Sequence, residues 1–185
     1  MKVLLTGSHG SGKSTLAELL GASLDWPLVK EGAREILKRH DVREELNILP
    51  IAQRVEIQQE ILEWHSAERE KYKECIEDRG IVDVLAYSSY WLSREVEAQE
   101  FIARLGQQVD EFSAKGSYDK IIVCPPTIPL ISDGVRADQP AYRDTIHYLI
   151  LGILERYSFK YNVLESISLA DRLRESLKII RRPNG

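Results

Sequence analysis

Cysteine, histidine and long apolar runs are scarce in this 185-residue chain, and each scarcity excludes a class of protein. Two cysteines cannot build a disulfide framework, and they suit a reducing compartment. The four histidines are dispersed and lack the spacing of a structural zinc site. No stretch approaches the ~18 consecutive apolar residues of a membrane span, and the apolar run at residues 3–5 is too short for a signal peptide. We therefore expect a cytoplasmic protein that does not cross a membrane.

Glycine and proline, at 11 and 7 residues, are too few for a low-complexity chain. Hydrophobic residues make up 43% of the sequence and charged residues 29%, which are ordinary values for a globular domain. The net charge of −4 argues weakly against a dedicated nucleic-acid scaffold, although a local basic groove stays open. No linker or repeat interrupts the chain, so we expect one domain over residues 1–185.

Short apolar runs alternate with helical patterns along the whole sequence. The runs predict five strands, at residues 2–6, 28–30, 74–78, 120–124 and 161–164. Helices are expected between and after them, at about 14–20, 32–40, 51–73, 82–92, 96–114, 141–157 and 169–181. Because no hairpin signal joins the strands, the pattern predicts an α/β fold with a parallel sheet covered by helices on both faces.

The most specific motif follows the first predicted strand. Residues 7–14 read Gly-Ser-His-Gly-Ser-Gly-Lys-Ser and fit the pattern G-x-x-x-x-G-K-[ST] in full. A strand precedes the motif and a helix follows it, which is the context that a phosphate-binding P-loop requires. The motif therefore predicts a nucleoside triphosphate site, for which we expect ATP and Mg²⁺.

Each residue type in this loop has a chemical reason. Glycines let the backbone turn its N–H groups around a phosphate, and the following helix adds the positive end of its dipole. Lys13 can reach the β- and γ-phosphates, and the hydroxyl of Ser14 can ligate Mg²⁺. The expected nucleotide-binding residues are Gly7, Ser8, His9, Gly10, Ser11, Gly12, Lys13, Ser14 and Thr15.

Two motifs that are typical of GTPases and of motor or AAA-type ATPases are missing. The sequence has no Asn-Lys-x-Asp motif, with which GTPases read guanine. The segment over residues 75–79 ends in Asp-Arg, whereas motor and AAA-type ATPases usually end this strand in Asp-Glu. Small phosphotransferases remain as the leading class.

Further segments of the sequence resemble the small P-loop kinase group. They are Glu-Gly-Ala-Arg-Glu at 31–35, Asp-Arg-x-x-x-Asp-x-x-Ala-Tyr at 78–87 and Asp-Gly-x-Arg at 133–136. This group includes nicotinamide-riboside-kinase-like AAA-domain ATPases, thymidylate kinases, deoxynucleoside kinases and polynucleotide 5′-kinases. The resemblance implies a five-stranded parallel sheet in the order 2-3-1-4-5. It also implies transfer of the γ-phosphoryl group of ATP, with Mg²⁺, to a hydroxyl or a phosphate.

The resemblance also implies roles for residues on the acceptor side. Glu31 follows the second predicted strand, where open α/β sheets bind ligands, and similar hydroxyl kinases use an acidic residue there as the general base. A carboxylate that stabilises a helix N-terminus is the structural alternative for Glu31. Arg34, one helical turn later, is expected to hold a phosphate or phosphodiester of the acceptor.

The third predicted strand leads into a second group of candidates. The resemblance implies that Asp78 orders Mg²⁺ through water and that Arg79 holds the acceptor. A buried Asp–Arg pair that only compensates its own charges is the alternative. Asp83 and Tyr87 are four residues apart on the next predicted helix, so they share a face that is expected to line the acceptor pocket.

Residues 127–140, after the fourth predicted strand, are rich in proline, aspartate and glycine and are expected to form a lid. An arginine in such a lid can stabilise charge on the transferred phosphoryl group. Arg136 is the first candidate and Arg143 the second.

Three functions remain open on the sequence. The first is a kinase that transfers the phosphoryl group to a hydroxyl of a small molecule of nucleoside, nucleotide or nicotinamide-riboside type. The second is a kinase acting on nucleic acid, at a 5′-hydroxyl end or a hydroxymethylated base, with basic residues between 34 and 43 lining a groove. The third is a nucleotide-binding switch, against which Glu31 argues, because a switch needs no acidic base. The sequence does not decide the oligomeric state, although relatives are often homodimers.

Overall fold

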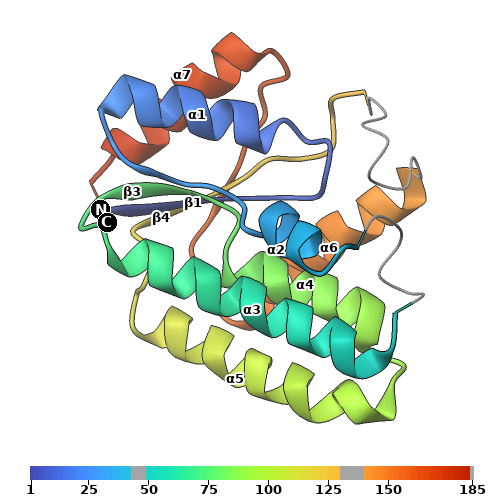
Figure 1. The fold of residues 1–185 in the computed structure, drawn as a ribbon. Coiled ribbons are helices and arrows are strands. Elements are labelled where there is room, and N and C mark those ends of the chain that lie inside the picture. The colour runs from blue at the N-terminus through green and yellow to red at the C-terminus, as the bar shows by residue number, and fades with distance from the viewer. Residues whose placement is uncertain (43–48, 130–139, 184–185) are drawn as a thin grey trace.

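The computed structural model describes residues 1–42, 49–129 and 140–183. Five parallel strands form one sheet in the order β2-β3-β1-β4-β5, and helices cover both of its faces (Figure 1). The strands are β1 (Lys2–Thr6), β2 (Leu28–Val29), β3 (Cys75–Asp78), β4 (Lys120–Val123) and β5 (Asn162–Val163). The sheet and its predicted order are confirmed.

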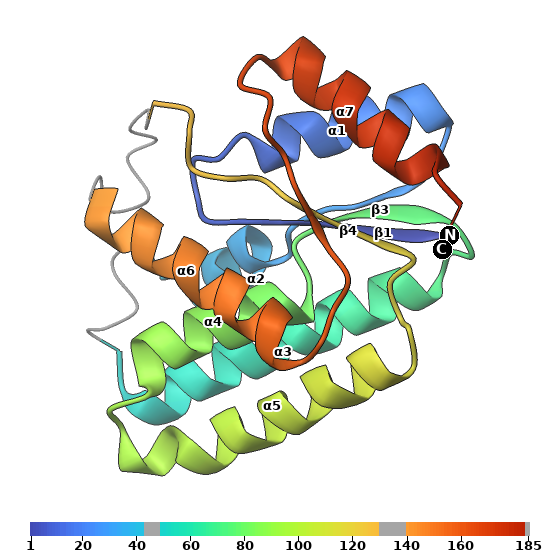
Figure 2. The same cartoon turned by 180° about the vertical axis from the view of Figure 1, so that it is seen from behind.

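The helices divide unequally between the two faces of the sheet. Helices α1 and α7 cover one face, and α2 to α6 lie on the other (Figures 1 and 2). Their bounds are α1 (Lys13–Leu24), α2 (Ala33–Arg39), α3 (Ile51–Glu70), α4 (Ile81–Leu92), α5 (Gln99–Ala114), α6 (Pro140–Arg156) and α7 (Leu169–Arg181). In the described part of the chain no helix is long and apolar enough to cross a membrane.

The central strand β1 shows why both faces are covered. Successive side chains of a strand point to opposite faces, and in β1 both sets are apolar. Val3 and Leu5 join the core beneath α1 and α7, whereas Leu4 joins the larger core on the other face. All three are fully buried. A strand of this kind is stable only as the centre of a three-layer fold, which is what the continuous apolar run predicted.

Three predicted helices differ from the structure. The first, predicted at about 14–20, runs from Lys13 to Leu24. The helix predicted at 96–114 begins as a 3₁₀ helix, η2 (Val96–Ala98), before α5 starts at Gln99. The Gln99 side-chain amide donates to the carbonyls of Ser93 and Glu95, which holds this tighter first turn. The helix predicted at 51–73 ends earlier, at Glu70. Residues 130–139, the greater part of the predicted lid, lie outside the described residues.

Strand register brings the candidate residues to one edge of the sheet. Leu5 of β1 lies opposite Asp78 of β3, and Thr6 lies opposite Val123 of β4. Because the strands are parallel, the segments that follow them leave from the same edge. The P-loop, Glu31, Arg79 and the segment after Val123 therefore meet there.

Candidate active site

The phosphate-binding loop leaves β1 through two backbone positions that exclude a side chain. Gly7 has a φ of 142°, and a Cβ atom there would collide with the carbonyl oxygen of Cys124. Gly12 has a φ of 77°, and a Cβ atom would lie 2.9 Å from the Cδ1 atom of Ile128. The loop is therefore built into the edge of the sheet, pressed against the segment that follows β4.

Lys13, the first residue of α1, folds back onto this loop. Its Nζ donates to the carbonyl oxygen of Ser8 at 2.6 Å and to the hydroxyl of Ser11 at 3.2 Å. Burial, together with the positive charge of Arg79, lowers the pKa of Lys13 from 10.5 to about 8. The ammonium group is thus held in the loop, in an environment where a negatively charged ligand would favour its charged form.

Asp78 and Ser14 fit a magnesium ion. Asp78 is buried at the end of β3, and its Oδ1 has no hydrogen-bond partner among the described residues. Ser14, in the first turn of α1, is exposed. No cluster of three or more His, Cys, Asp or Glu that could hold a metal occurs in the described ranges. Magnesium binds through one or two side chains plus phosphates and water, and these donors match that habit.

Arg79 contacts three of the other predicted acceptor-side residues, so that the four form one cluster. Its Nε lies 2.8 Å from Oε1 of Glu31, and its Nη1 lies 3.4 Å from Oδ1 of Asp83. Its guanidinium also covers the ring of Tyr87, 4.9 Å from the centroid. Arg79 has a φ of 73°, so the backbone itself turns at this residue. The residues come from the segments after β2 and β3 and from α4.

Charge and burial oppose each other in this cluster. Burial lowers the pKa of Arg79, but the carboxylates of Glu31 and Asp83 outweigh it and hold that pKa well above its usual value. Burial raises the pKa of Asp83, which Arg79 and Lys13 counteract. Asp83 also accepts a hydrogen bond from the backbone N–H of Gly80 at 3.0 Å, at the start of α4. Asp83 therefore has a structural task in addition to facing Arg79.

Aromatic rings gather between α4 and α6, beside the P-loop. Tyr142 is their centre, with ring centroids 4.9 Å from His9, 4.8 Å from Tyr90, 5.4 Å from Trp91 and 6.5 Å from Tyr87. The indole N–H of Trp91 donates to the hydroxyl of Tyr142 at 3.1 Å. The side chain of His9 is buried in this cluster.

Three candidate arginines remain, two predicted for the lid and one for the acceptor side, and the structure describes the side chain of one of them. Arg143, on α6, donates to the carbonyl oxygen of Ile128 at 2.9 Å and therefore fixes the start of the predicted lid. Arg136 and the side chain of Arg34 lie outside the described parts of the structure.

Two buried residues near this edge escaped sequence reasoning. His65 on α3 is close enough to Glu31 and Arg79 to feel their charges, and burial lowers its pKa to about 4, so the imidazole is neutral. Arg172 on α7 donates to the carbonyl oxygen of Ser11, inside the P-loop, at 2.7 Å. Neither residue carries a sequence signal, because each sits among charged residues of an amphipathic helix.

Solved structures share this fold at low identity. NadR in complex with NR has a TM-score of 0.73 at 18% identity, over 97% of this chain and 50% of NadR. Deoxyadenosine kinase from M. mycoides with bound dCTP has 0.72 at 16% identity, over 97% and 98% of the two chains. Thymidylate kinase from Ehrlichia chaffeensis has 0.63 at 15% identity, over 98% of each.

These likenesses show the fold alone, and the chain spans about half the length of NadR. No curated protein matches the sequence. A family model described as an AAA domain matches residues 2–172, which is most of the chain. This match confirms the resemblance drawn from the motifs: the chain belongs to this AAA domain family, and it shares the fold of the small P-loop kinases named above.

Proposed function

We propose that the protein is an ATP- and Mg²⁺-dependent phosphotransferase that moves the γ-phosphoryl group to a hydroxyl of a nucleoside- or nucleotide-type acceptor. One observation carries the proposal. Arg79 contacts both the P-loop and Glu31: its Nη1 lies 3.5 Å from the Gly7 carbonyl oxygen, and its Nε pairs with Glu31. An acidic group is thereby fixed next to the P-loop, which hydrolysis or switching alone would not need.

Glu31 is the proposed general base. Its ion pair with Arg79 holds the carboxylate in position beside the P-loop, and correct positioning is the first requirement for a general base. In the reaction, the acceptor oxygen forms a bond to the γ-phosphorus, the bond from that phosphorus to the leaving ADP oxygen breaks, and the hydroxyl proton passes to Glu31. Lys13 exchanges the Ser8 carbonyl for phosphate oxygens and stabilises their charge.

The remaining candidate residues are assigned to the magnesium ion, to the acceptor and to the transferred phosphoryl group. Ser14 and, through water, Asp78 would hold the magnesium ion, which neutralises charge on the β- and γ-phosphates when bound. Arg34, Arg79, Asp83 and Tyr87 are the proposed acceptor-side residues. Arg136 is the proposed arginine for the transferred group. Arg143 is the second candidate, and it would have to release Ile128 first.

The aromatic cluster supports an acceptor that carries a planar ring. Tyr87 and Tyr90 lie on successive turns of α4, and both face Tyr142. Tyr90 is 38% exposed, so this cluster reaches the surface of the protein. Such rings give a flat heterocycle a stacking surface next to the proposed base.

A transfer screen tests the proposal. The protein would be incubated with γ-labelled ATP and a panel of nucleosides, nucleotides, oligonucleotides with free 5′-hydroxyls and DNA containing hydroxymethylated bases. Label is expected on a nucleoside- or nucleotide-type small molecule. Label on the oligonucleotides alone would move the function to a nucleic-acid kinase, and label released only as phosphate would favour a nucleotide switch.

Glu31→Gln tests the base within that screen. The amide keeps the size of the side chain but cannot take the proton, so kcat is expected to fall by ~10²–10⁴-fold with little change in ATP affinity. Glu35→Gln is the matched control, since Glu35 is exposed one turn later on α2. An unchanged kcat with a hydroxyl acceptor would refute the role of Glu31, and a slight loss with a phosphate acceptor would show that no base is needed.

A further inference from the structure

Arg172 connects three loops at the edge of the sheet. Its Nη1 donates to the Ser11 carbonyl oxygen at 2.7 Å, and its Nε donates to the Ser166 carbonyl oxygen at 2.9 Å. Its Nη2 donates to the hydroxyl of Thr127 at 2.8 Å and to the carbonyl oxygen of Pro125 at 3.4 Å. One side chain of α7 thus holds the P-loop, the segment after β4 and the segment after β5.

The charge of Arg172 has no carboxylate partner among the residues that the structure describes. The side chain is 1% exposed, and all four of its acceptors are neutral oxygens. The carboxylate of Glu175 lies near enough for the charge of Arg172 to act on it, but its oxygens accept from the backbone N–H groups of Glu165 and Ser166 and form no ion pair with the guanidinium. A buried cation without an ion-pair partner is costly, so its presence calls for a reason.

The other buried arginines show how unusual this is. Within the described ranges each of them lies within 3.1 Å of a carboxylate oxygen: Arg54 pairs with Glu95, Arg69 with Glu77 and Arg79 with Glu31. Among the described residues, the hydrogen bonds of the Arg172 guanidinium go to carbonyl and hydroxyl oxygens and to no carboxylate. Its location behind the P-loop suggests that the missing negative charge belongs to a ligand of that loop.

The hydrogen bond to Ser11 also fixes the direction of one backbone N–H group. The carbonyl of Ser11 and the N–H of Gly12 belong to one planar trans peptide, so they point in opposite directions. Because Arg172 holds the carbonyl on its own side, the N–H of Gly12 points away from Arg172. A phosphate in the loop would meet that N–H group without any rearrangement of the peptide.

We propose that Arg172 is a positioning residue for the polyphosphate of the nucleotide: it orients the peptide between Ser11 and Gly12, and phosphate bound in the loop compensates its charge. The proposal rests on the proposed function, because it assumes that the P-loop binds a nucleoside triphosphate. The ligand chemistry is the polyphosphate chain rather than the base or the ribose.

Binding measurements on two ligands test this role. ATP and inorganic tripolyphosphate, both with Mg²⁺, would be titrated into wild-type protein, Arg172→Met and Arg172→Lys. Arg172→Met is expected to weaken both ligands by the same factor, about tenfold or more, because the lost charge acts on phosphate. Arg172→Lys keeps the charge but not all four hydrogen bonds, so it is expected to recover part of the affinity. Arg174→Met is the control, since Arg174 is exposed and pairs with Asp171.

Each other outcome is decisive. Unchanged affinities in Arg172→Met, with or without a lower melting temperature, would show a merely structural residue and overturn the proposal. Weaker ATP binding with unchanged tripolyphosphate binding would place Arg172 at the base and overturn it as well. If Arg172→Met does not fold, wild-type affinity of Arg172→Lys for both ligands overturns the positioning role. If wild-type protein binds neither ligand, the proposed function itself fails, which separates the two failures.

Discussion

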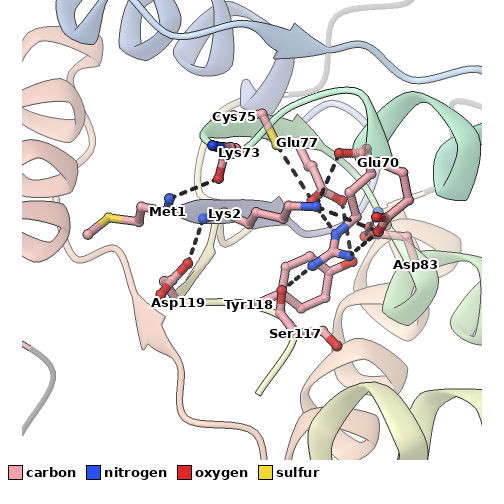
Figure 3. Close-up of polar contacts among 12 residues, drawn as sticks. Met1, Lys2, Glu70, Lys73, Cys75, Glu77, Asp83, Ser117, Tyr118 and Asp119 are labelled. Atoms are coloured by element: carbon pink, nitrogen blue, oxygen red, sulfur yellow. Dashed lines mark hydrogen bonds and ion pairs between the residues drawn. The ribbon is translucent and has the colours of Figure 1, made fainter. Parts of the chain in front are cut away.

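Two buried ionic clusters lie on consecutive residues of β3, and they are built in opposite ways. Glu77 belongs to the first, which lies on the face of the sheet that α3 and α5 cover (Figure 3). Its Oε1 accepts from the Nε of Arg69 at 2.9 Å, and its Oε2 accepts from the hydroxyl of Tyr118 at 3.4 Å. Arg69 also donates to the Ser117 carbonyl and lies over the rings of Phe112 and Tyr118. Both oxygens of the carboxylate have partners.

Asp78, the next residue of β3, belongs to the second cluster. This cluster comprises Asp78, Lys13 and Arg172 and lies at the edge of the sheet, around the P-loop. The Oδ1 of Asp78 has no hydrogen-bond partner among the described residues, and Lys13 nearby is bonded only to oxygens of its own loop. Arg172 behind the loop has no carboxylate partner in the described part of the chain. From this comparison we expect the fully satisfied ionic network to serve the fold and the incompletely satisfied one to serve a ligand.

Lys13→Met should give the largest difference between the two clusters. We expect transfer activity to fall by ~10³-fold or more, the size of a lost cationic contact to the transferred phosphoryl group. The melting temperature should not fall, because burial already disfavours the charged lysine in the ligand-free protein. Initial rates with γ-labelled ATP and thermal denaturation measure the two effects.

Lys115→Met is the control for this change. Lys115 is exposed at the end of α5, where it pairs with Glu111 at 3.1 Å. Activity within a few-fold of wild type in Lys13→Met would contradict the assignment of residues 7–15 as a phosphate-binding loop. A large loss of stability would contradict the claim that the second cluster is kept for a ligand.

Glu77→Gln should have the opposite effects: a loss of stability with unchanged specific activity. Burial raises the pKa of Glu77 to about 7 although Arg69 opposes this, so the test belongs at pH 8, where the carboxylate is ionised. Arg69 cannot lose its charge, so the variant leaves it uncompensated and should lower the free energy of unfolding by about 3–5 kcal/mol. Urea unfolding measures this, and the specific activity of the folded fraction should stay at the wild-type value.

The exposed pair between Lys115 and Glu111 again supplies the control. Glu111→Gln removes the same charge where water screens it, so we expect a change below about 1 kcal/mol. A comparable cost for the two variants would show that the Glu77 cluster adds no more than a surface ion pair. A large drop in specific activity in Glu77→Gln would contradict the claim that the Glu77 cluster serves only the fold.

Local patterns in the sequence predicted the elements of the fold but not their arrangement. The apolar run of β1 predicted a buried strand, and the glycines before Lys13 predicted the turn into α1. The order of the strands came from the resemblance to the kinase group, since pairing joins segments that no local pattern links. The 3₁₀ turn before Gln99 was missed, because side-chain hydrogen bonds to Ser93 and Glu95 decide it.

The site divides in the same way between local and long-range contacts. The P-loop is contiguous, so its motif is visible in the sequence. The contact between Arg79 and Asp83 was not predicted although only four positions separate them, because Arg79 precedes α4 and turns the backbone with a φ of 73°. The hydrogen bond from Arg172 to Ser11 joins residues 161 positions apart. Such a contact depends on the docking of α7 beside α1, which only the folded chain provides.

The smallest expected effect is a difference in pH dependence. In the ligand-free protein, burial lowers the pKa of Lys13 to about 8, against 10.5 for an ordinary lysine. Between these values the unfolded chain binds more protons than the folded one, so this residue makes stability rise as the pH rises. Lys13→Met lacks the group. The unfolding free energy of wild type minus that of Lys13→Met should therefore increase by about 1–2 kcal/mol from pH 7.5 to 9.5.

Urea unfolding at pH 7.5, 8.5 and 9.5 without nucleotide measures this difference, and subtraction removes the titration of groups that both proteins share. Lys115→Met, in which an exposed lysine is lost, should give a flat difference over the same range. A flat difference for Lys13→Met as well would mean that the ammonium group is not desolvated in the empty loop. Lys13 would then resemble a surface lysine. The contrast between the fully hydrogen-bonded cluster at Glu77 and the incompletely satisfied cluster at the P-loop would lose its electrostatic basis.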